Sequence, residues 1–328
     1  MALSGEFVDQ HIESWQHELT SAYYPHRKHW PAYLFHHAPM ENAVAILRDG
    51  HLRSRNDVAN CRPRDVAAPG VIDTRIEAHH RVRLYFRPKT PTQWHIEGIR
   101  KLGECAYGDE THAGVLVMFA LDARTILTKP DIMFSNQNMQ LGNTQAGSDE
   151  NYFSEIPFIK VYSEGNTGGD KSYTDARCAE VLPSSPLLLH ECLKGIYLRS
   201  EPELETLLHL LGDTREHWEK FCHVSDALKV FQKDYTFVQV FRLSSDGVVF
   251  RFNPRRDGRN LKVLIRLWDS IGALVVDFFN DDHSATPKPP FENWIWEQKL
   301  KDGDYLAEVH LDDTLAYRSE LSLGDSLF

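Results

Sequence analysis

The sequence lacks the features that would place a protein in or across a membrane. No apolar run in its 328 residues approaches the roughly 20 residues that a bilayer-spanning helix requires. Residues 1–10 have neither the basic start nor the apolar core of a secretory signal. We therefore expect a cytoplasmic protein without a membrane partner.

Patterned cysteines and metal-binding motifs are also missing. The five cysteines include no CxxC pair, and an odd, scattered set is typical of reduced cytosolic thiols. The 17 histidines form no HExxH motif and no tight cluster with cysteine. We therefore predict no metal.

A surplus of positive charge is absent as well. The formal net charge of −11 argues against binding nucleic acid with the whole surface, although it permits a local basic groove. A hydrophobic content of 42% and a charged content of 25% are ordinary for a soluble globular protein. The length indicates two domains or one elaborated domain.

Strands and helices alternate over the first two thirds of the chain. The spacing of apolar residues predicts strands at 33–38, 82–86, 115–121 and 195–199 and helices at 5–20, 41–50, 72–80, 92–102, 201–211 and 214–223. Residues 134–174 are polar, lack periodicity and predict one long loop, which is usually functional or disordered.

From about residue 230 the sequence becomes rich in strand signals. We expect strands at 237–243, 248–252, 261–267, 273–279, 294–296 and 305–311, with hairpin turns at 244–247 and 253–260. We therefore predict an α+β domain over residues 1–224 and a β-rich C-terminal domain of unknown role over residues 225–328.

Glu180 is the first candidate catalytic residue. It begins a short strand that ends at Pro183, and it follows the long polar loop. A carboxylate in this position either decorates the strand end or performs chemistry, and the preceding loop favours chemistry.

Several motifs occur in an order typical of a known family. In chain order they are Leu34-Phe35-His36-His37-Ala38, a helix with the ending Ile-Leu-Arg-Asp-Gly, a helix that holds Arg75, Tyr85-Phe86-Arg87-Pro88-Lys89-Thr90-Pro91, the apolar strand at 115–121, Phe134-Ser135-Asn136 and Arg177-Cys178-Ala179-Glu180-Val181-Leu182. Over about residues 30–212 this ordered set resembles the DarT family of nucleic-acid ADP-ribosyltransferases, toxins of bacterial toxin–antitoxin systems. Residues 225–328 have no recognised counterpart in the minimal family domain.

The resemblance implies an ADP-ribosyltransferase fold with a split β core, and transfer of ADP-ribose from NAD to a nucleobase. By motif, the implied catalytic residues are Glu180 and Arg75, and the implied NAD-contacting residues are His36, Ala38, Asn42 and Tyr85. It also implies a role in phage defence and a cognate antitoxin that reverses the modification.

The chemistry of the reaction suits these residue types. Cleavage of the nicotinamide–ribose bond develops positive charge on the sugar, which a carboxylate such as Glu180 stabilises. A carboxylate also accepts a nucleobase proton, and an arginine such as Arg75 clamps a pyrophosphate. Structural alternatives remain. Arg75 could lie on a solvated helix face, His36 and Tyr85 could be core residues, and Asn42 could cap or orient its helix.

Basic residues alternate with aromatic ones over residues 81–101. Arg83, Arg87 and Lys89 are the candidate nucleic-acid contacts, because a single strand needs positive charge for its phosphates and aromatic faces for its bases. The alternative is a solvated strand and helix surface.

Three functions stay open at this point. The first is ADP-ribosylation of single-stranded DNA, and the second is the same chemistry on RNA or protein. The third is a non-catalytic domain that binds a nucleotide or a partner, against which Glu180 in its motif argues. The β-rich tail could bind nucleic acid, an antitoxin or an infection trigger.

Overall fold

A computed structural model of the chain describes residues 2–66, 79–101, 103–105, 107–139, 144–286, 292–295 and 299–324. The chain forms two compact units, each built from several stretches of sequence. Unit 1 comprises Met1–Ile96, Val117–Tyr197 and Ser225–Gln232, and unit 2 comprises Glu97–Leu116, Leu198–Val224 and Lys233–Phe328. Both units therefore draw residues from across the chain.

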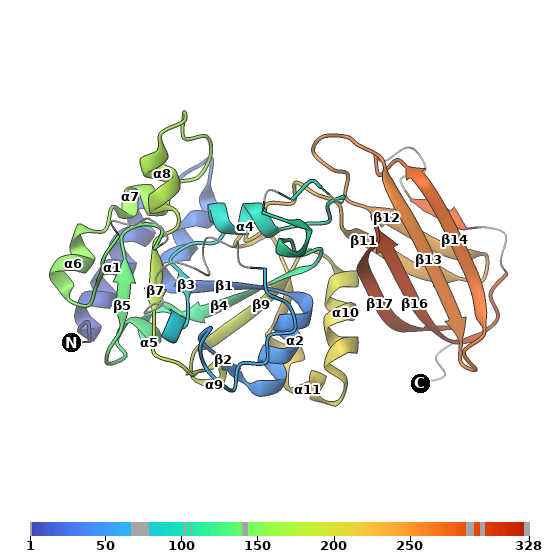
Figure 1. The fold of residues 1–328 in the computed structure, drawn as a ribbon, viewed down its shortest axis with the longest axis horizontal. Coiled ribbons are helices and arrows are strands. Elements are labelled where there is room, and N and C mark those ends of the chain that lie inside the picture. Colours follow the sequence, from blue (N-terminus) through green and yellow to red (C-terminus); the bar gives the residue numbers. More distant parts are fainter. Residues whose placement is uncertain are drawn as a thin grey trace. The chain divides into compact units, whose positions relative to one another are not determined.

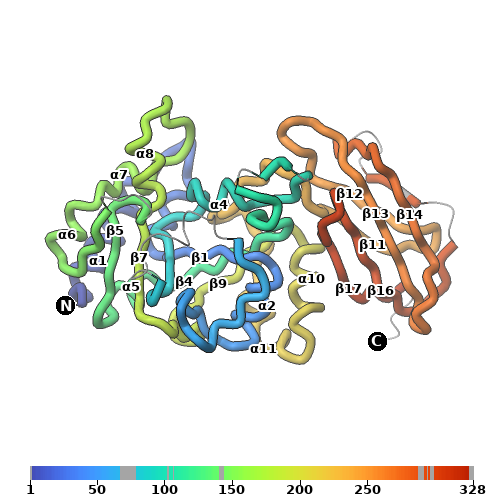
Figure 2. Tube along the Cα trace, viewed as in Figure 1, coloured from blue at the N-terminus to red at the C-terminus, as the bar shows by residue number. Residues whose placement is uncertain are grey.

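The sheet of unit 1 brings distant parts of the sequence side by side (Figure 1). Its strand order is β9-β4-β1-β3-β7-β5-β6. The strands are β1 (Tyr33–Pro39), β3 (Leu84–Tyr85), β4 (Leu116–Asp122), β5 (Met133–Ser135), β6 (Ala146–Gly147), β7 (Glu180–Leu182) and β9 (Leu193–Leu198). The short strand β3 pairs antiparallel with β1 on one side and with β7 on the other. Figure 2 shows β1, β4 and β9 close together in the trace of unit 1. A separate pair joins β2 (His51–Leu52) to β8 (Leu187–Leu188).

Short helices complete unit 1. They are α1 (Gly5–Glu18), η1 (Pro25–Ala32), α2 (Met40–Asp49), α4 (Pro91–Ile96), α5 (Ala123–Leu127), α6 (Glu150–Glu155), α7 (Phe158–Val161), α8 (Lys171–Ala176) and α9 (Leu189–Cys192). The Asp122 side chain caps α5 by accepting the Thr125 N–H at 2.7 Å. Gly50 ends α2 in the left-handed conformation, at φ 72°, which glycine adopts without steric cost. The predicted helices at 5–20 and 41–50 are confirmed.

The prediction of one long loop over residues 134–174 is wrong. The segment contains the strand β6 and the helices α6, α7 and α8, and Asp149 and Asp170 are the N-caps of α6 and α8. These helices span only 4–6 residues, too few for a 3.6-residue period to emerge. Tertiary packing stabilises them instead: Phe153 of α6 and Phe158 of α7 contact each other with ring centroids 5.1 Å apart.

Two other helix predictions near the site need correction. The helix expected over residues 92–102 ends at Ile96, and the following residues make isolated β-bridges. Most of the helix expected over residues 72–80 lies outside the described residues.

Unit 2 is a β-rich body with one longer helix. One sheet has the order β11-β12-β15, and the other has the order β14-β13-β16-β17. Its elements are η3 (Asp109–Thr111), α10 (Glu201–Leu211), η4 (Gly212–Thr214), α11 (Arg215–Trp218), η5 (Glu219–Phe221), β10 (Cys222–Val224), β11 (Val238–Ser244), β12 (Gly247–Phe252), β13 (Leu261–Asp269), β14 (Leu274–His283), β15 (Asn293–Ile295), β16 (Gly303–Leu311) and β17 (Thr314–Leu323). Buried residues of both sheets, among them Phe250, Ile265 and Val309, form its core.

The β-rich C-terminal region is confirmed, with changes to its connections. Residues 253–260 are not a hairpin turn, because β12 and β13 belong to different sheets. The strand β17 was not predicted, and the helix expected at 214–223 is a single α-helical turn, α11, between two 3-10 turns.

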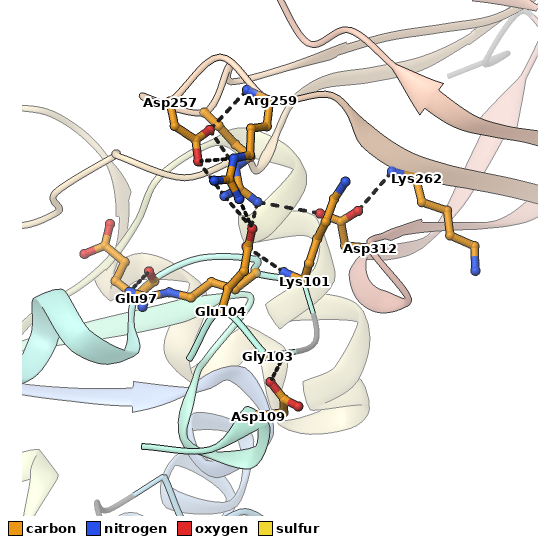
Figure 3. Close-up of polar contacts among 11 residues, drawn as sticks. Glu97, Lys101, Gly103, Glu104, Asp109, Asp257, Arg259, Lys262 and Asp312 are labelled. Carbon is orange, nitrogen blue, oxygen red and sulfur yellow. Dashed lines mark hydrogen bonds and ion pairs between the residues drawn. The ribbon is translucent and has the colours of Figure 1, made fainter. Parts of the chain in front are cut away.

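A polar cluster joins distant parts of unit 2 (Figure 3). Arg255, only 3% exposed at its side chain, donates to both oxygens of Glu104 at 2.9 and 3.2 Å and pairs with Asp257 at 2.7 Å. Arg259 also donates to Glu104, at 3.0 Å. The stretch Glu97–Leu116, which precedes most of β4, is thus held by the loop between β12 and β13. The chain as a whole is a mixed α/β protein with a large sheet and a β-rich C-terminal region.

Candidate functional site

Glu180 is the first residue of β7, and its position is tightly defined. The residue is 2% exposed. Its backbone N–H donates to Ser135 Oγ of β5 at 3.0 Å, and that hydroxyl donates to the Gln137 carbonyl at 2.7 Å. A buried backbone group with a partner costs little, so β5 fixes the start of β7 without strain. The carboxylate is therefore held on a rigid element rather than on a loose strand end.

Tyr85 lies opposite Glu180 in the sheet. The register pairs Tyr85 of β3 with Glu180 of β7 and, on its other side, with Phe35 of β1. Directly opposed residues project to the same side of a sheet. Two residues after Phe35, His37 returns to that side, and its ring stacks on Tyr85 with centroids 5.4 Å apart and planes 7° apart. Three strands thus place a carboxylate beside a pair of stacked rings.

Arg83 makes the closest polar contact with the Glu180 carboxylate. Its Nε donates to Oε2 at 2.9 Å and its Nη2 to Oε1 at 3.1 Å. The Arg83 side chain is 25% exposed and that of Glu180 only 3%. Burial raises the pKa of Glu180 above its usual value, and the Arg83 guanidinium opposes that rise. Arg83 was predicted to contact nucleic acid, but its guanidinium faces the catalytic candidate.

Two neutral groups, Tyr85 and Cys178, also lie close to Glu180. Burial raises the pKa of the Tyr85 hydroxyl, and the Glu180 carboxylate raises it further. Burial likewise raises the pKa of the Cys178 thiol to about 12, so Cys178 is a neutral thiol near pH 7. Thr92 of α4 is hydrogen-bonded to both Tyr85 and Cys178.

His36 reaches the site through the backbone. Its Nδ1 donates to the Arg83 carbonyl oxygen at 3.0 Å when that nitrogen carries the proton. Burial lowers the pKa of His36, so the ring is neutral near pH 7. Strand alternation directs His36 to the opposite side of β1 from His37, and its ring lies 6.1 Å from that of Phe119. The predicted NAD contact of His36 stays a prediction.

Asn42 of α2 holds a backbone segment. Its Nδ2 donates to the Arg64 carbonyl at 2.7 Å, and its Oδ1 accepts the Arg64 N–H at 2.9 Å. Asn42 thus ties the Arg64 backbone to α2 rather than capping its own helix, and an NAD contact by Asn42 stays a prediction. Ala38 is buried near the end of β1. The predicted catalytic residue Arg75 lies outside the described residues.

The other two predicted nucleic-acid contacts point inward. Arg87 is 2% exposed and donates to the carbonyls of Pro88 at 2.8 Å and Val161 at 3.2 Å. Its guanidinium also lies 4.9 Å from the centroid of the Trp30 ring. These contacts argue against a nucleic-acid contact by Arg87, because a buried guanidinium cannot meet a phosphate. Lys89 Nζ donates to Glu164 Oε1 at 2.8 Å.

Sequence reasoning missed His37, Ser135 and Thr92 as members of the site. Ser135 stands in the Phe-Ser-Asn motif, and Thr92 directly follows Pro91, but neither position carries a local signal for its partner. The described residues include no cluster of His, Cys, Asp and Glu able to hold a metal ion. None of the helices in the described ranges is long and apolar enough to cross a membrane.

Comparisons with known proteins bear on the same stretch of chain. The family model described as "ssDNA thymidine ADP-ribosyltransferase, DarT" matches residues 35–228. Among solved structures, DarT of Thermus sp. 2.9 in complex with ADP-ribosylated ssDNA is 16% identical with a TM-score of 0.47, over 57% of this chain and 90% of that one. The same enzyme in complex with NAD+ gives 16% identity and a TM-score of 0.45, over 57% and 91%.

A further solved structure, Thermosipho africanus DarTG in complex with ADP-ribose, is 18% identical with a TM-score of 0.42, over 61% of this chain and 51% of that one. A comparison with curated proteins found no significant match. The family match covers more than half of the chain and includes Glu180, Tyr85 and Arg83. It confirms the predicted enzyme class, an ADP-ribosyltransferase that acts on single-stranded DNA. The chain therefore belongs to the DarT family of ADP-ribosyltransferases that act on thymidine in single-stranded DNA.

Proposed function

We propose that Glu180 is the catalytic carboxylate of this chain and that it acts within the site formed by β1, β3 and β7. The observation that carries this proposal is the pairing of Tyr85 in β3 with Glu180 in β7, where Glu180 is only 2% exposed. A buried carboxylate beside aromatic rings is costly for stability, and groups of this kind concentrate where chemistry requires them. The central strands thus correspond to the split β core of an ADP-ribosyltransferase.

Glu180 has two tasks in the proposed reaction. Thymine in DNA has one ring N–H, because its other ring nitrogen carries the deoxyribose. Glu180 accepts that proton as the nitrogen forms a bond to C1′ of the nicotinamide ribose. The nicotinamide–C1′ bond breaks at the same carbon, and nicotinamide leaves as a neutral molecule with the bonding electron pair. The carboxylate also stabilises the positive charge that develops on the ribose during transfer.

The stacked rings of Tyr85 and His37 are the proposed contact surface for NAD. Burial lowers the pKa of His37 to about 3, so this ring is neutral and does not repel the cationic nicotinamide. An aromatic face also attracts a ligand cation. His36 and Ala38 of β1 and Asn42 of α2 remain candidate NAD contacts.

The proposal extends to the biological setting. An enzyme that modifies DNA bases damages its own cell, so we place this chain as the toxin of a toxin–antitoxin pair that contributes to phage defence. The partner antitoxin would remove the modification. The proposed division into a catalytic domain, residues 1–224, and a C-terminal domain, residues 225–328, belongs to the same proposal.

The direct test is incubation with NAD and short single-stranded oligonucleotides, followed by mass spectrometry of the nucleosides. An oligonucleotide with one thymidine should gain one ADP-ribose, and a matched oligonucleotide with deoxyuridine should report whether the methyl group matters. An oligonucleotide without either base is the control. Labelling of RNA alone, or of the control oligonucleotide that lacks both thymidine and deoxyuridine, would contradict the proposal.

A further inference from the structure

We propose that Arg83 is a positioning residue of this enzyme, which holds the Glu180 carboxylate in one orientation and in its ionised form. The inference rests on the proposed catalytic role of Glu180. It replaces the expectation that Arg83 contacts nucleic acid.

The contact geometry supports this role. Two different nitrogens of Arg83 meet two different oxygens of Glu180, at 2.9 and 3.1 Å. Such a fork-to-fork contact fixes the rotation of the carboxylate as well as its position, which a single contact from lysine cannot do. Each carboxylate oxygen has a second lone pair that is free to accept a proton or a ribose hydroxyl.

The backbone of Arg83 is anchored as firmly as its side chain. Its carbonyl accepts a hydrogen bond from His36 of β1, and the next residue, Leu84, pairs with Val181 of β7. Strands on both sides therefore fix the position of the backbone from which the Arg83 side chain extends. A group acting by preorganisation needs this kind of support, because a misplacement of about 1 Å can cost a hundredfold in rate.

Charge gives the second reason. In the part of the chain that the structure describes, the titratable groups that face Glu180 are Tyr85 of β3, Arg83 just before that strand and Cys178 just before β7. Tyr85 and Cys178 are neutral near pH 7, because burial raises the pKa of both. Among the described residues, Arg83 is the cation paired with Glu180. A proton acceptor must be ionised, and without Arg83 burial would favour the protonated carboxyl group.

The test compares Arg83→Gln with Arg83→Lys on a thymidine-containing oligonucleotide across a range of pH. For Arg83→Gln we expect kcat near pH 7 to fall on the order of tenfold to a hundredfold. The acid limb, which is the fall of kcat at low pH, should move to higher pH. The KM values for NAD and DNA should change little. Arg83→Lys restores the positive charge but not the contact of two nitrogens with two oxygens. The acid limb of kcat should therefore return toward that of the wild type, while kcat itself stays reduced.

A nucleic-acid contact would behave differently. Arg83→Gln would then raise the KM for DNA and reduce the salt dependence of binding by about one unit of slope, with kcat at saturating DNA and the acid limb both unchanged. That pattern would overturn the inference. Arg124→Gln is the matched control, because Arg124 also pairs with a carboxylate, Asp9, at 2.7 Å, but on the exposed surface.

Two further measurements separate the possible failures. Thermal unfolding of each variant shows whether it is folded. If Arg83→Gln does not fold, the pH profile and kcat of Arg83→Lys still test the inference. Glu180→Gln is assayed alongside: full activity of that variant would refute the proposed function itself. An inactive Glu180→Gln combined with an unshifted pH profile of both Arg83 variants would refute the positioning role alone.

Discussion

Tyr85 and Glu180 are directly opposed residues of the neighbouring strands β3 and β7, so their side chains leave the sheet on the same side. The same register extends to Phe35 of β1, and His37 stacks on Tyr85 from there. A carboxylate, a phenol and an imidazole therefore meet through ordinary antiparallel pairing. The predictions below test what this arrangement does.

Replacing Glu180 by Gln should remove turnover while leaving NAD bound. The substitution keeps the shape and hydrogen-bonding capacity of the side chain but removes its charge and basicity. Because the carboxylate acts mainly in the transition state, we expect kcat to fall on the order of a hundredfold or more, with little change in NAD affinity. Single-turnover kinetics and calorimetric NAD titration measure the two quantities.

The matched control for that experiment is Glu191→Gln. Glu191 also pairs with a cation, Lys129 at 2.6 Å, but it is 40% exposed at its side chain. Surface pairs of this kind contribute about 0–1 kcal/mol to stability, and we expect wild-type turnover. If Glu180→Gln and Glu191→Gln turned over equally well, Glu180 could not be the catalytic carboxylate.

Activity should fall at acid pH before the protein unfolds. Glu180 must be ionised to accept a proton, and burial raises its pKa above the usual 4.5, so the acid limb of kcat should lie above pH 4.5. A raised pKa in the folded state means that the folded protein binds this proton more readily than the unfolded chain does. Protonation of Glu180 therefore does not reduce the free energy of unfolding.

Circular dichroism recorded through the pH titration checks this expectation. The spectrum should stay native across the acid limb, and activity should return on neutralisation. An acid limb that coincides with loss of the native spectrum would show that inactivation is unfolding rather than protonation of Glu180.

Arg87→Met should destabilise the protein without weakening its binding to DNA. Arg87 is buried and donates to the carbonyls of Pro88 and Val161, which the methionine would leave unsatisfied. We expect the free energy of unfolding to fall by about 2–4 kcal/mol. Denaturant unfolding measures the loss. A weaker salt dependence of DNA binding in the folded variant would instead restore Arg87 as a phosphate contact.

A fragment ending at residue 232 should be more stable than one ending at residue 224. Trp30 Nε1 donates to the Leu228 carbonyl at 2.9 Å, and Gln93 Nε2 donates to the Val230 carbonyl at 2.8 Å. The shorter fragment loses both acceptors and leaves buried donors without partners. The melting temperatures of the two fragments test this difference in stability. NAD binding by each fragment shows whether its NAD site is intact. Equal melting temperatures would support the predicted boundary at residue 224.

Local signals in the sequence were enough to predict much of this protein. The helix over residues 41–50 with its terminal glycine and the apolar strand β4 each have a pattern that depends only on neighbouring residues. Glu180 was predicted as the catalytic candidate in the same way, from its strand and its motif, together with the order of motifs that indicated the family, and its catalytic role stays a prediction. Tyr85 was also predicted from its motif, although no local pattern reveals that it lies opposite Glu180.

Tertiary structure alone revealed the partners of these residues. Arg83 and Arg87 belong to one basic segment of the sequence. No local pattern shows that Arg83 pairs with Glu180 while Arg87 is buried against Trp30. Likewise, α6 is too short for periodicity to predict it, and Phe153 stabilises it from the core. Pairings between distant strands depend on the register of the whole sheet. Because burial and charge neutralisation arise only after that register has formed, the roles of these arginines follow from the fold.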